Sequence, residues 1–306
     1  MQKRQVGSSD LFISEISLGC MSLGTDEKKA QTIIDKALDA GINYLDTADL
    51  YDQGVNESIV GKAVKGKREN VIIGTKVGNR FEVGKEGWHW DPSKKYIKEE
   101  VKDSLRRLHT DYIDLYQLHG GTLEDPIDET IEAFEELKQE GLIRYYGISS
   151  IRPNVIREFI KKSNIVSVMM QYSLFDRRPE EEVLDLLHEN NISVLARGPL
   201  AKGMLSKKGL AQVETKGRDG YLDYEYEELK TSTAAFLHFV NEERTPNAIA
   251  LQYVLKHPAL ASAVFGASSI NQLEENLTYL NSKPLDDNLY NQLKKMTKPI
   301  KYNKHR

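Results

Sequence analysis

The chain has 306 residues, of which 40% are hydrophobic and 29% charged, with a formal net charge of -4. This acidic balance argues against a nucleic-acid partner, because phosphate contacts need clustered Lys and Arg. No signal-peptide core or apolar run of about 18 residues occurs, and the single cysteine, Cys20, excludes an intrachain disulfide framework. We therefore expect a cytoplasmic protein with no membrane span and no required protein partner.

In chain order, the sequence first predicts a short hairpin and then alternating strands and helices. The hairpin strands are expected at residues 4–6 and 11–13, separated by Gly7-Ser8-Ser9-Asp10. Later strands are predicted at residues 16–19, 42–45, 71–76, 112–118, 144–148, 167–170, 192–196 and 261–265. Helices are predicted at residues 26–40, 56–65, 92–108, 126–140, 153–162, 179–190, 246–256 and 270–280, with a long irregular region after residue 196.

Eight strand-then-helix units without a long polar linker indicate a single (β/α)8 TIM-barrel domain over residues 1–306. A doubly wound sheet is the alternative, but no GxGxxG motif follows any strand. Three long connections, at residues 77–91, 120–125 and 198–223, are expected at the C-terminal face of the barrel. Trp88, His89 and Trp90 in the first connection suggest an aromatic pocket wall, or alternatively a loop that packs its own aromatics.

Ionisable side chains follow consecutive predicted strands. Asp46, with Tyr51 behind it, ends the second barrel strand, Lys76 ends the third and His119 follows the fourth. Singly, each has an ordinary interpretation: a helix cap, a half-buried aromatic, a surface lysine or a core histidine. In a barrel, however, all of them converge at one mouth, and a chance convergence of four such groups is much rarer.

These four groups have a coherent chemical task. A phenol has a reference pKa near ~10, so it is a poor acid at neutral pH unless a cation stabilises its phenolate. Lys76 can supply that cation, Asp46 can hold Lys76, and His119 can donate a hydrogen bond to a carbonyl oxygen. Tyr51 would then pass a proton to a developing alkoxide. The hydride must come from a cofactor, because no side chain supplies one.

Together these residues resemble the motifs of the aldo-keto reductase family, whose catalytic tetrad falls on Asp46, Tyr51, Lys76 and His119. The similarity extends over nearly the whole chain. The matching segments are Tyr44-Leu45-Asp46-Thr47-Ala48, Gly74-Thr75-Lys76, Asp114-Leu115-Tyr116-Gln117-Leu118-His119, Gly147-Ile148-Ser149, Gln171-Tyr172-Ser173-Leu174 and Gly266-Ala267-Ser268-Ser269 through Glu275-Asn276.

The resemblance implies that NADPH binds in an extended form across the barrel mouth, without a Rossmann motif. Ser149 and Gln171 would hold the nicotinamide carboxamide, and Gly19, Cys20 and Met21 would lie beneath its ribose. Further cofactor contacts are implied for Asp46, Arg197, Pro199, Leu200, Ala201, Gly203, Leu205 and Lys208, and for Gly266, Ser268, Gln272, Glu275 and Asn276 at the adenosine end. The residues indicate no metal site.

Two positions depart from the family pattern. Ser150 stands where many relatives have Asn, and Arg197 stands where many stack an aromatic on the nicotinamide. A guanidinium can stack on a ring, but it repels the cationic oxidised form, so we expect NADPH to bind more tightly than NADP+. No Arg occurs in residues 268–276, so NADPH is favoured over NADH only moderately, through Ser268, Gln272 and Lys208.

The leading interpretation is an enzyme that reduces aldehyde or ketone carbonyls of small molecules to alcohols. A second is a redox-sensing regulatory subunit with little turnover, because the adenosine-site pattern at residues 268–276 resembles that of potassium-channel β subunits. A third is a barrel aldolase that uses Lys76 for a Schiff base. The intact tetrad favours turnover over sensing, and the adenosine-site motif argues against the aldolase.

Overall fold

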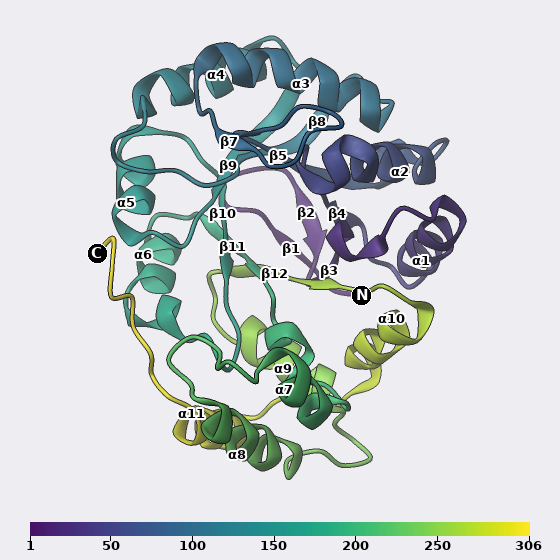
Figure 1. Cartoon of the computed structure of the whole chain (residues 1–306), viewed down its shortest axis with the longest axis vertical. Coiled ribbons are helices and arrows are strands. Elements are labelled where there is room, and N and C mark those ends of the chain that lie inside the picture. Colours follow the sequence, from purple (N-terminus) through teal and green to yellow (C-terminus); the bar gives the residue numbers. More distant parts are fainter.

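The computed structural model describes residues 1–306, and its eight parallel strands close into a barrel, as Figure 1 shows. Neighbouring strands follow the order β3, β4, β5, β8, β9, β10, β11 and β12 around the barrel. Their bounds are Ile16–Gly19, Tyr44–Asp46, Ile72–Val77, Ile113–Leu118, Ile143–Ser149, Ser167–Gln171, Ser193–Arg197 and Leu260–Gly266. The predicted TIM barrel is confirmed, and the doubly wound alternative is wrong.

Helices surround the barrel and cover the outer faces of its strands (Figure 1). The helices are α1 Glu27–Asp39, α2 Val55–Ala63, α3 Lys94–Leu108, α4 Ile127–Gln139, α5 Pro153–Lys162, α6 Val183–Glu189, α7 Gly209–Lys216, α8 Tyr226–Leu237, α9 Pro246–Leu255, α10 Ile270–Leu277 and α11 Asp287–Met296. None of them is both long and apolar enough to cross a bilayer.

The periodicity of the sequence explains why these elements form. All six residues of β8 are buried, as expected for a strand covered on both faces. In α1 the buried positions are Ala30, Ile33, Ile34 and Ala37, which form one face of a helix. The side chain of Asp26 caps this helix by accepting from the backbone N–H of Lys29. Such faces pack against the strands and fix the direction of each strand end.

An N-terminal hairpin of β1 (Lys3–Gln5) and β2 (Phe12–Ser14) precedes the barrel, as predicted. Val6, Leu11 and Ile13 are buried and belong to a separate apolar cluster with inward-facing barrel residues. The hairpin therefore lies on the end of the barrel where the strands begin, and the opposite end is left for a ligand site.

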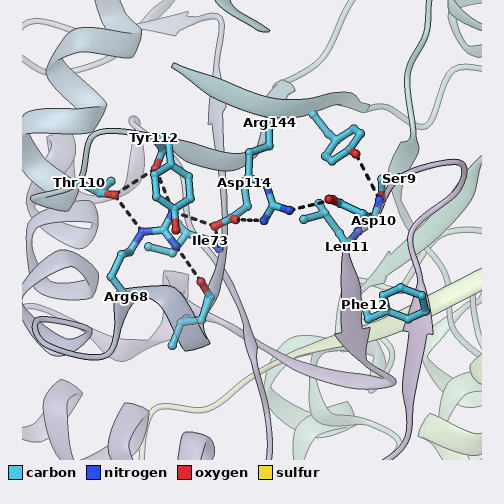
Figure 2. A network of polar contacts seen from close by, with 12 residues as sticks. Ser9, Asp10, Leu11, Phe12, Arg68, Ile73, Thr110, Tyr112, Asp114 and Arg144 are labelled. Carbon is cyan, nitrogen blue, oxygen red and sulfur yellow. Dashed lines mark hydrogen bonds and ion pairs between the residues drawn. The ribbon is translucent and has the colours of Figure 1, made fainter. Parts of the chain in front are cut away.

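A polar network fastens the hairpin to the strand beginnings, as Figure 2 shows. The Asp114 carboxylate pairs with Arg68 and with Arg144, at 2.8 Å each, and accepts from the backbone N–H of Ile73 at 2.9 Å. Arg144 also pairs with Asp10 in the hairpin turn at 2.8 Å. Since the Asp114 side chain is only 2% exposed, these partners offset the cost of burying its charge.

The expectation of a long irregular region after residue 196 is wrong, because helices α7 and α8 lie there. Helix α8 buries Leu229, Thr233 and Phe236, which lie four and three residues apart on one face. Glu225 and Glu228 form a capping box at its start. Both signals are present in the sequence, so this helix was predictable.

The structure differs from the predicted elements in three smaller ways. The C-terminal helix α11 was not predicted, although Asp286 caps it and Leu293 is buried on its inner face. The helix expected at residues 179–190 begins with a separate 3-10 turn, Arg178–Glu181, before α6. The connection at residues 77–91 contains a small antiparallel pair of β6 (Asn79–Arg80) and β7 (His89–Trp90).

After α11 the chain returns along the side of the barrel to α5, as the yellow segment in Figure 1 shows. The Tyr302 ring is buried on this path, and the Arg178 guanidinium lies 5.0 Å from its centroid. The backbone N–H of Asn154 donates to the carbonyl of His305 at 2.9 Å. These contacts hold the C-terminal segment against α5 and against the 3-10 turn that begins at Arg178.

Candidate active site

The structure brings the four predicted ionisable residues together at the C-terminal end of the barrel. Asp46 is the last residue of β4, Lys76 lies near the end of β5, and His119 directly follows β8. Tyr51 begins a short 3-10 segment, Tyr51–Gly54, in the connection after β4. The polar residues thus come from three neighbouring strands, because parallel strands all end at the same face.

Lys76 is the centre of this group. Its side chain is 1% exposed, and its Nζ donates to Asp46 Oδ2 at 2.7 Å, to the carbonyl of Thr47 at 2.6 Å and to the hydroxyl of Tyr51 at 3.4 Å. An ammonium has three N–H donors, so these contacts use all of them. The lysine therefore cannot rotate away from the phenol without losing a buried hydrogen bond.

The Asp46–Lys76 pair carries opposite charges inside the barrel. Burial alone would lower the pKa of Lys76, but the Asp46 carboxylate beside it, together with Tyr51, raises this pKa above its ordinary value. Burial raises the pKa of Asp46, and Lys76 partly offsets that effect. The hydroxyl of Tyr44 also donates to Asp46 at 3.3 Å. The lysine consequently stays charged beside Tyr51.

The turn that carries Tyr51 has an unusual backbone. Asp52 and Gln53 have φ values of 49° and 52°, and Gly54 follows with a φ of 85°. A Cβ added at Gly54 would lie 2.7 Å from Cδ of Arg107, so the glycine lets α3 support the turn. Gln53 binds the next connection through the N–H of Gly84 at 2.9 Å. The turn that carries the phenol is therefore supported by α3 on one side and by the connection at Gly84 on the other.

His119 lies beside Tyr51 in an uncharged state. The two rings meet edge to face, with centroids 5.9 Å apart and an interplanar angle of 83°. Burial, together with the positive charges of Lys76 and Arg197, lowers the pKa of His119 to about 3. A neutral imidazole has one N–H donor, and Nδ1 of His119 has no hydrogen-bond partner in the protein.

This arrangement combines a fixed phenol, a buried cation and a neutral imidazole. Tyr51 is half-buried, so its hydroxyl can meet a ligand from the barrel mouth. The pair of hydrogen-bond donors, Tyr51 and His119, can hold one carbonyl oxygen between them. Such a group can give a proton to an oxygen on which negative charge develops.

Two glycines, Gly19 and Gly266, lie at the ends of β3 and β12, and Gly19 is the register partner of Asp46. Gly19 and Gly266 are register partners in these neighbouring strands, and Gly266 is exposed. The following Cys20 side chain is fully buried, and burial raises the pKa of its thiol well above its usual range, whereas Met21 is exposed. The exposed backbone of Gly266 is accessible to the dinucleotide that the motifs imply.

The residues expected at the carboxamide lie at the ends of β9 and β10. Ser149 is half-buried, and the hydroxyl of its neighbour Ser150 accepts from the N–H of Arg152 at 3.2 Å. Gln171 donates to the hydroxyl of Tyr221 at 3.0 Å and accepts from Arg197 at 3.1 Å. The Ser150 hydroxyl is therefore directed toward its own loop. Arg197 lies close enough to Gln171 to contact a ligand that binds Gln171.

The connection expected to contact the pyrophosphate is a folded turn. The backbone N–H groups of Ala201 and Gly203 donate to the carbonyls of Gly198 and Leu200 at 3.0 and 2.9 Å, and that of Leu205 also donates to Leu200. These particular N–H groups close the turn itself. Lys208 is exposed and directly precedes α7, so its amino group is accessible to a phosphate. The role of this connection stays a prediction.

The residues expected at the adenosine end lie between the end of β12 and the last turn of α10. Gln272 accepts from both the N–H and the hydroxyl of Ser268, at 2.8 and 3.0 Å. Glu275 is half-buried one turn later, whereas Asn276 is buried and accepts from Asn247 at 2.7 Å. Ser268, Gln272 and Glu275 thus remain accessible to a ligand, and Asn276 ties α10 to α9.

Only part of the expected aromatic wall faces the site. Trp88 is 55% exposed and His89 is also exposed, but Trp90 is half-buried. Its indole N–H donates to Asp125 at 2.9 Å, and a Cβ added at Gly120, next to His119, would lie 3.2 Å from its ring. Trp90 therefore borders the site on the His119 side.

Two residues of the site were missed from the sequence. Tyr44 lies two positions before Asp46, and side chains at that spacing share one face of a strand, so its contact with Asp46 was predictable. Tyr221 lies 50 positions after Gln171 in a connection with no regular pattern, so no local signal announced their contact.

The chain is similar in sequence and in structure to known proteins. The model of the aldo/keto reductase family matches residues 15–298. The Bacillus subtilis oxidoreductase YqkF is 60% identical, with the whole of both chains covered. The Escherichia coli NADH-specific methylglyoxal reductase is 32% identical over 92% of this chain and 94% of that protein. The holo structure of aldo-keto reductase AKR11C1 from Bacillus halodurans matches with a TM-score of 0.93 and 59% identity, over 100% of this chain and 99% of that one.

Proposed function

Since this chain belongs to the aldo/keto reductase family and is thus an oxidoreductase, we propose that it reduces aldehyde or ketone carbonyls with NADPH and that Tyr51 donates the proton. The proposal rests on one observation above all: a buried, charged Lys76 donates to the Tyr51 hydroxyl at 3.4 Å. A cation in that place stabilises the phenolate that forms when Tyr51 gives up its proton.

In this mechanism each residue has a separate task. A bound nicotinamide dinucleotide would supply the hydride that the reduction needs. His119, as a neutral imidazole, donates a hydrogen bond to the carbonyl oxygen and orients it toward Tyr51. Tyr51 transfers its proton to that oxygen as the alkoxide forms, and Lys76 stabilises the phenolate left behind. Asp46 keeps Lys76 charged and in place.

The cofactor would lie across the mouth from β9 and β10 to α10. Ser149 and Gln171 would hold the carboxamide, Gly19 and Gly266 would let the ribose approach the backbone, and Ser268 with Gln272 would meet the adenosine phosphate. An E. coli relative is named an NADH-specific methylglyoxal reductase, so membership of the family does not by itself imply NADPH. We propose NADPH on the grounds of Ser268, Gln272 and Lys208 at the adenosine end.

The contacts of Lys76 disfavour the aldolase alternative. A Schiff base needs a neutral amine, yet Asp46 raises the pKa of Lys76, and its three N–H groups are engaged. Borohydride treatment with a carbonyl substrate should therefore leave Lys76 unmodified, as mass spectrometry of the intact chain would reveal. A covalent adduct on Lys76 would support the aldolase instead.

Turnover with a panel of substrates tests the proposed function. Purified protein should oxidise NADPH in the presence of small aldehydes and ketones, followed at the absorbance of the reduced nicotinamide, and an alcohol should accumulate in equal amount. NADH in place of NADPH should give a lower kcat/KM. Binding of NADPH without turnover of any carbonyl compound would support the redox-sensing alternative, and a higher kcat/KM with NADH would contradict the choice of cofactor.

A further inference from the structure

The side-chain amide of Gln171 is held at both of its polar atoms. Its Nε2 donates to the hydroxyl of Tyr221 at 3.0 Å, and its Oε1 accepts from Nη1 of Arg197 at 3.1 Å. Gln171 and Arg197 are register partners at the ends of β10 and β11. Tyr221 reaches the amide from the connection between α7 and α8.

The chemistry of Arg197 determines which way this amide points. A guanidinium only donates hydrogen bonds, so the amide oxygen must face Arg197 and the amide nitrogen must face Tyr221. A hydroxyl accepts as readily as it donates, which makes Tyr221 the complementary partner for that nitrogen. Neither contact alone holds both ends of the amide.

These two contacts leave one N–H and one oxygen lone pair of Gln171 for a ligand. A primary carboxamide presents the matching acceptor and donor. We propose that Tyr221 is a positioning residue that, with Arg197, fixes the Gln171 amide in the orientation that pairs with the nicotinamide carboxamide. This inference rests on the proposed function, because it takes a nicotinamide dinucleotide as the ligand.

Tyr221 is built to be a fixed partner. It is 7% exposed, and burial raises its pKa to about 12, so its hydroxyl remains neutral. A tight antiparallel bridge with Tyr224 closes its loop, with N–H to carbonyl distances of 3.0 and 3.1 Å. The amino group of Lys202 lies 5.6 Å from the centre of its ring. The hydroxyl therefore has a defined place above Gln171.

The test compares two ligands and two phenylalanine variants. NADPH carries the carboxamide, and 2'-phospho-ADP-ribose has the adenosine and pyrophosphate parts without it. We expect Tyr221→Phe to weaken NADPH binding about three- to tenfold, the effect of one hydrogen bond, and to leave the Kd of 2'-phospho-ADP-ribose within about twofold of the parent value. Isothermal titration calorimetry measures both constants.

Tyr224→Phe is the matched control. Tyr224 lies in the same loop and is also buried, but its hydroxyl accepts from the N–H of Lys298 at 2.7 Å and does not contact Gln171. The Tyr224→Phe protein should bind NADPH and 2'-phospho-ADP-ribose as tightly as the parent does. If Tyr224→Phe weakens NADPH binding as much as Tyr221→Phe, or if Tyr221→Phe weakens both ligands equally, the loop has only a structural role and the inference is wrong.

A double-mutant cycle with Gln171→Ala gives the second readout. Tyr221 is proposed to act through Gln171, so Tyr221→Phe should have no further effect on NADPH binding once Gln171 is alanine. Additive losses would overturn the inference, while leaving the proposed function intact. The inference would also be wrong if the parent protein bound NADPH no more tightly than 2'-phospho-ADP-ribose. Binding of neither ligand would overturn the proposed function itself.

Discussion

The ammonium nitrogen of Lys76 lies 3.4 Å from the hydroxyl oxygen of Tyr51, although the two residues are 25 positions apart in the chain. Lys76 is held there by Asp46 on the neighbouring strand β4 and by the carbonyl of Thr47. The contact therefore depends on the barrel rather than on the flexibility of one side chain. The contact places a fixed positive charge beside the Tyr51 phenol at the barrel mouth.

Replacing Lys76 by Met should abolish turnover and destabilise the fold. The Asp46 carboxylate would remain buried without its cation, which costs about 3–5 kcal/mol in comparable buried pairs. Urea unfolding of Lys76→Met and of Lys76→Met with Asp46→Asn measures this. The double variant should be more stable than the single one and equally inactive. A single variant as stable as the parent would show that the pair carries little energy.

His119 should contribute to the pH dependence of stability below about pH 6.5. Its pKa falls to about 3 in the folded protein, so the unfolded state takes up its proton first. This contribution is fully present above the unfolded pKa and is lost as the pH falls toward 3, by at most about 1.4 kcal/mol per pH unit. Urea unfolding of parent and His119→Gln between pH 6.5 and 4 should give a steeper decline for the parent. Parallel curves would mean that His119 is protonated in the folded state.

Arg197 should make the protein prefer the reduced cofactor. Its guanidinium donates to Gln171 at 3.1 Å and carries a positive charge that repels the cationic oxidised nicotinamide. Fluorescence titration should show tighter binding of NADPH than of NADP+, and Arg197→Met should reduce that ratio about two- to fivefold, as for an exposed charge pair. Using the ratio cancels any loss common to both forms. Equal affinities in the parent would contradict this expectation.

Asp114, at the opposite end of the barrel, should affect stability but not catalysis. Asp114→Ala removes the carboxylate that pairs with Arg68 and Arg144, at an expected cost of about 3 kcal/mol. Asp103→Ala removes an exposed ion pair with Arg106 and should cost less than about 1 kcal/mol. Urea unfolding gives both values, and the turnover of folded Asp114→Ala should equal that of the parent. A similar small effect of both substitutions would show that the network in Figure 2 is not needed for stability.

The sequence allowed the barrel and the central group to be predicted for a physical reason. Parallel strands end at one face, so Asp46, Lys76 and His119 at consecutive strand ends had to lie near one another. Helices α8 and α11 also carry a helical apolar pattern, but they follow the helices α7 and α10 instead of a strand, so they lie outside the alternating strand-and-helix pattern. These errors did not affect the four ionisable residues, but they left Tyr221, between α7 and α8, unassigned.

Contacts that depend on the path of a long connection could not be predicted. Tyr221 meets Gln171 only because the turn at Tyr224 folds its loop back toward β10. Likewise, Trp90 turns inward while Trp88 stays exposed, and the two differ through the pairing of β6 with β7 rather than through residue type. No periodic pattern in the sequence encodes either outcome.

The most direct test of the central claim is the turnover of Tyr51→Phe, measured with saturating NADPH and a carbonyl compound that the parent reduces. We predict that kcat falls by at least about 100-fold, because the proton donor is missing, while the Kd of NADPH stays unchanged. Tyr226→Phe, which removes a hydroxyl on the outer helix α8, should retain parental kcat. A Tyr51→Phe protein with parental kcat would contradict the assignment of Tyr51 as the acid.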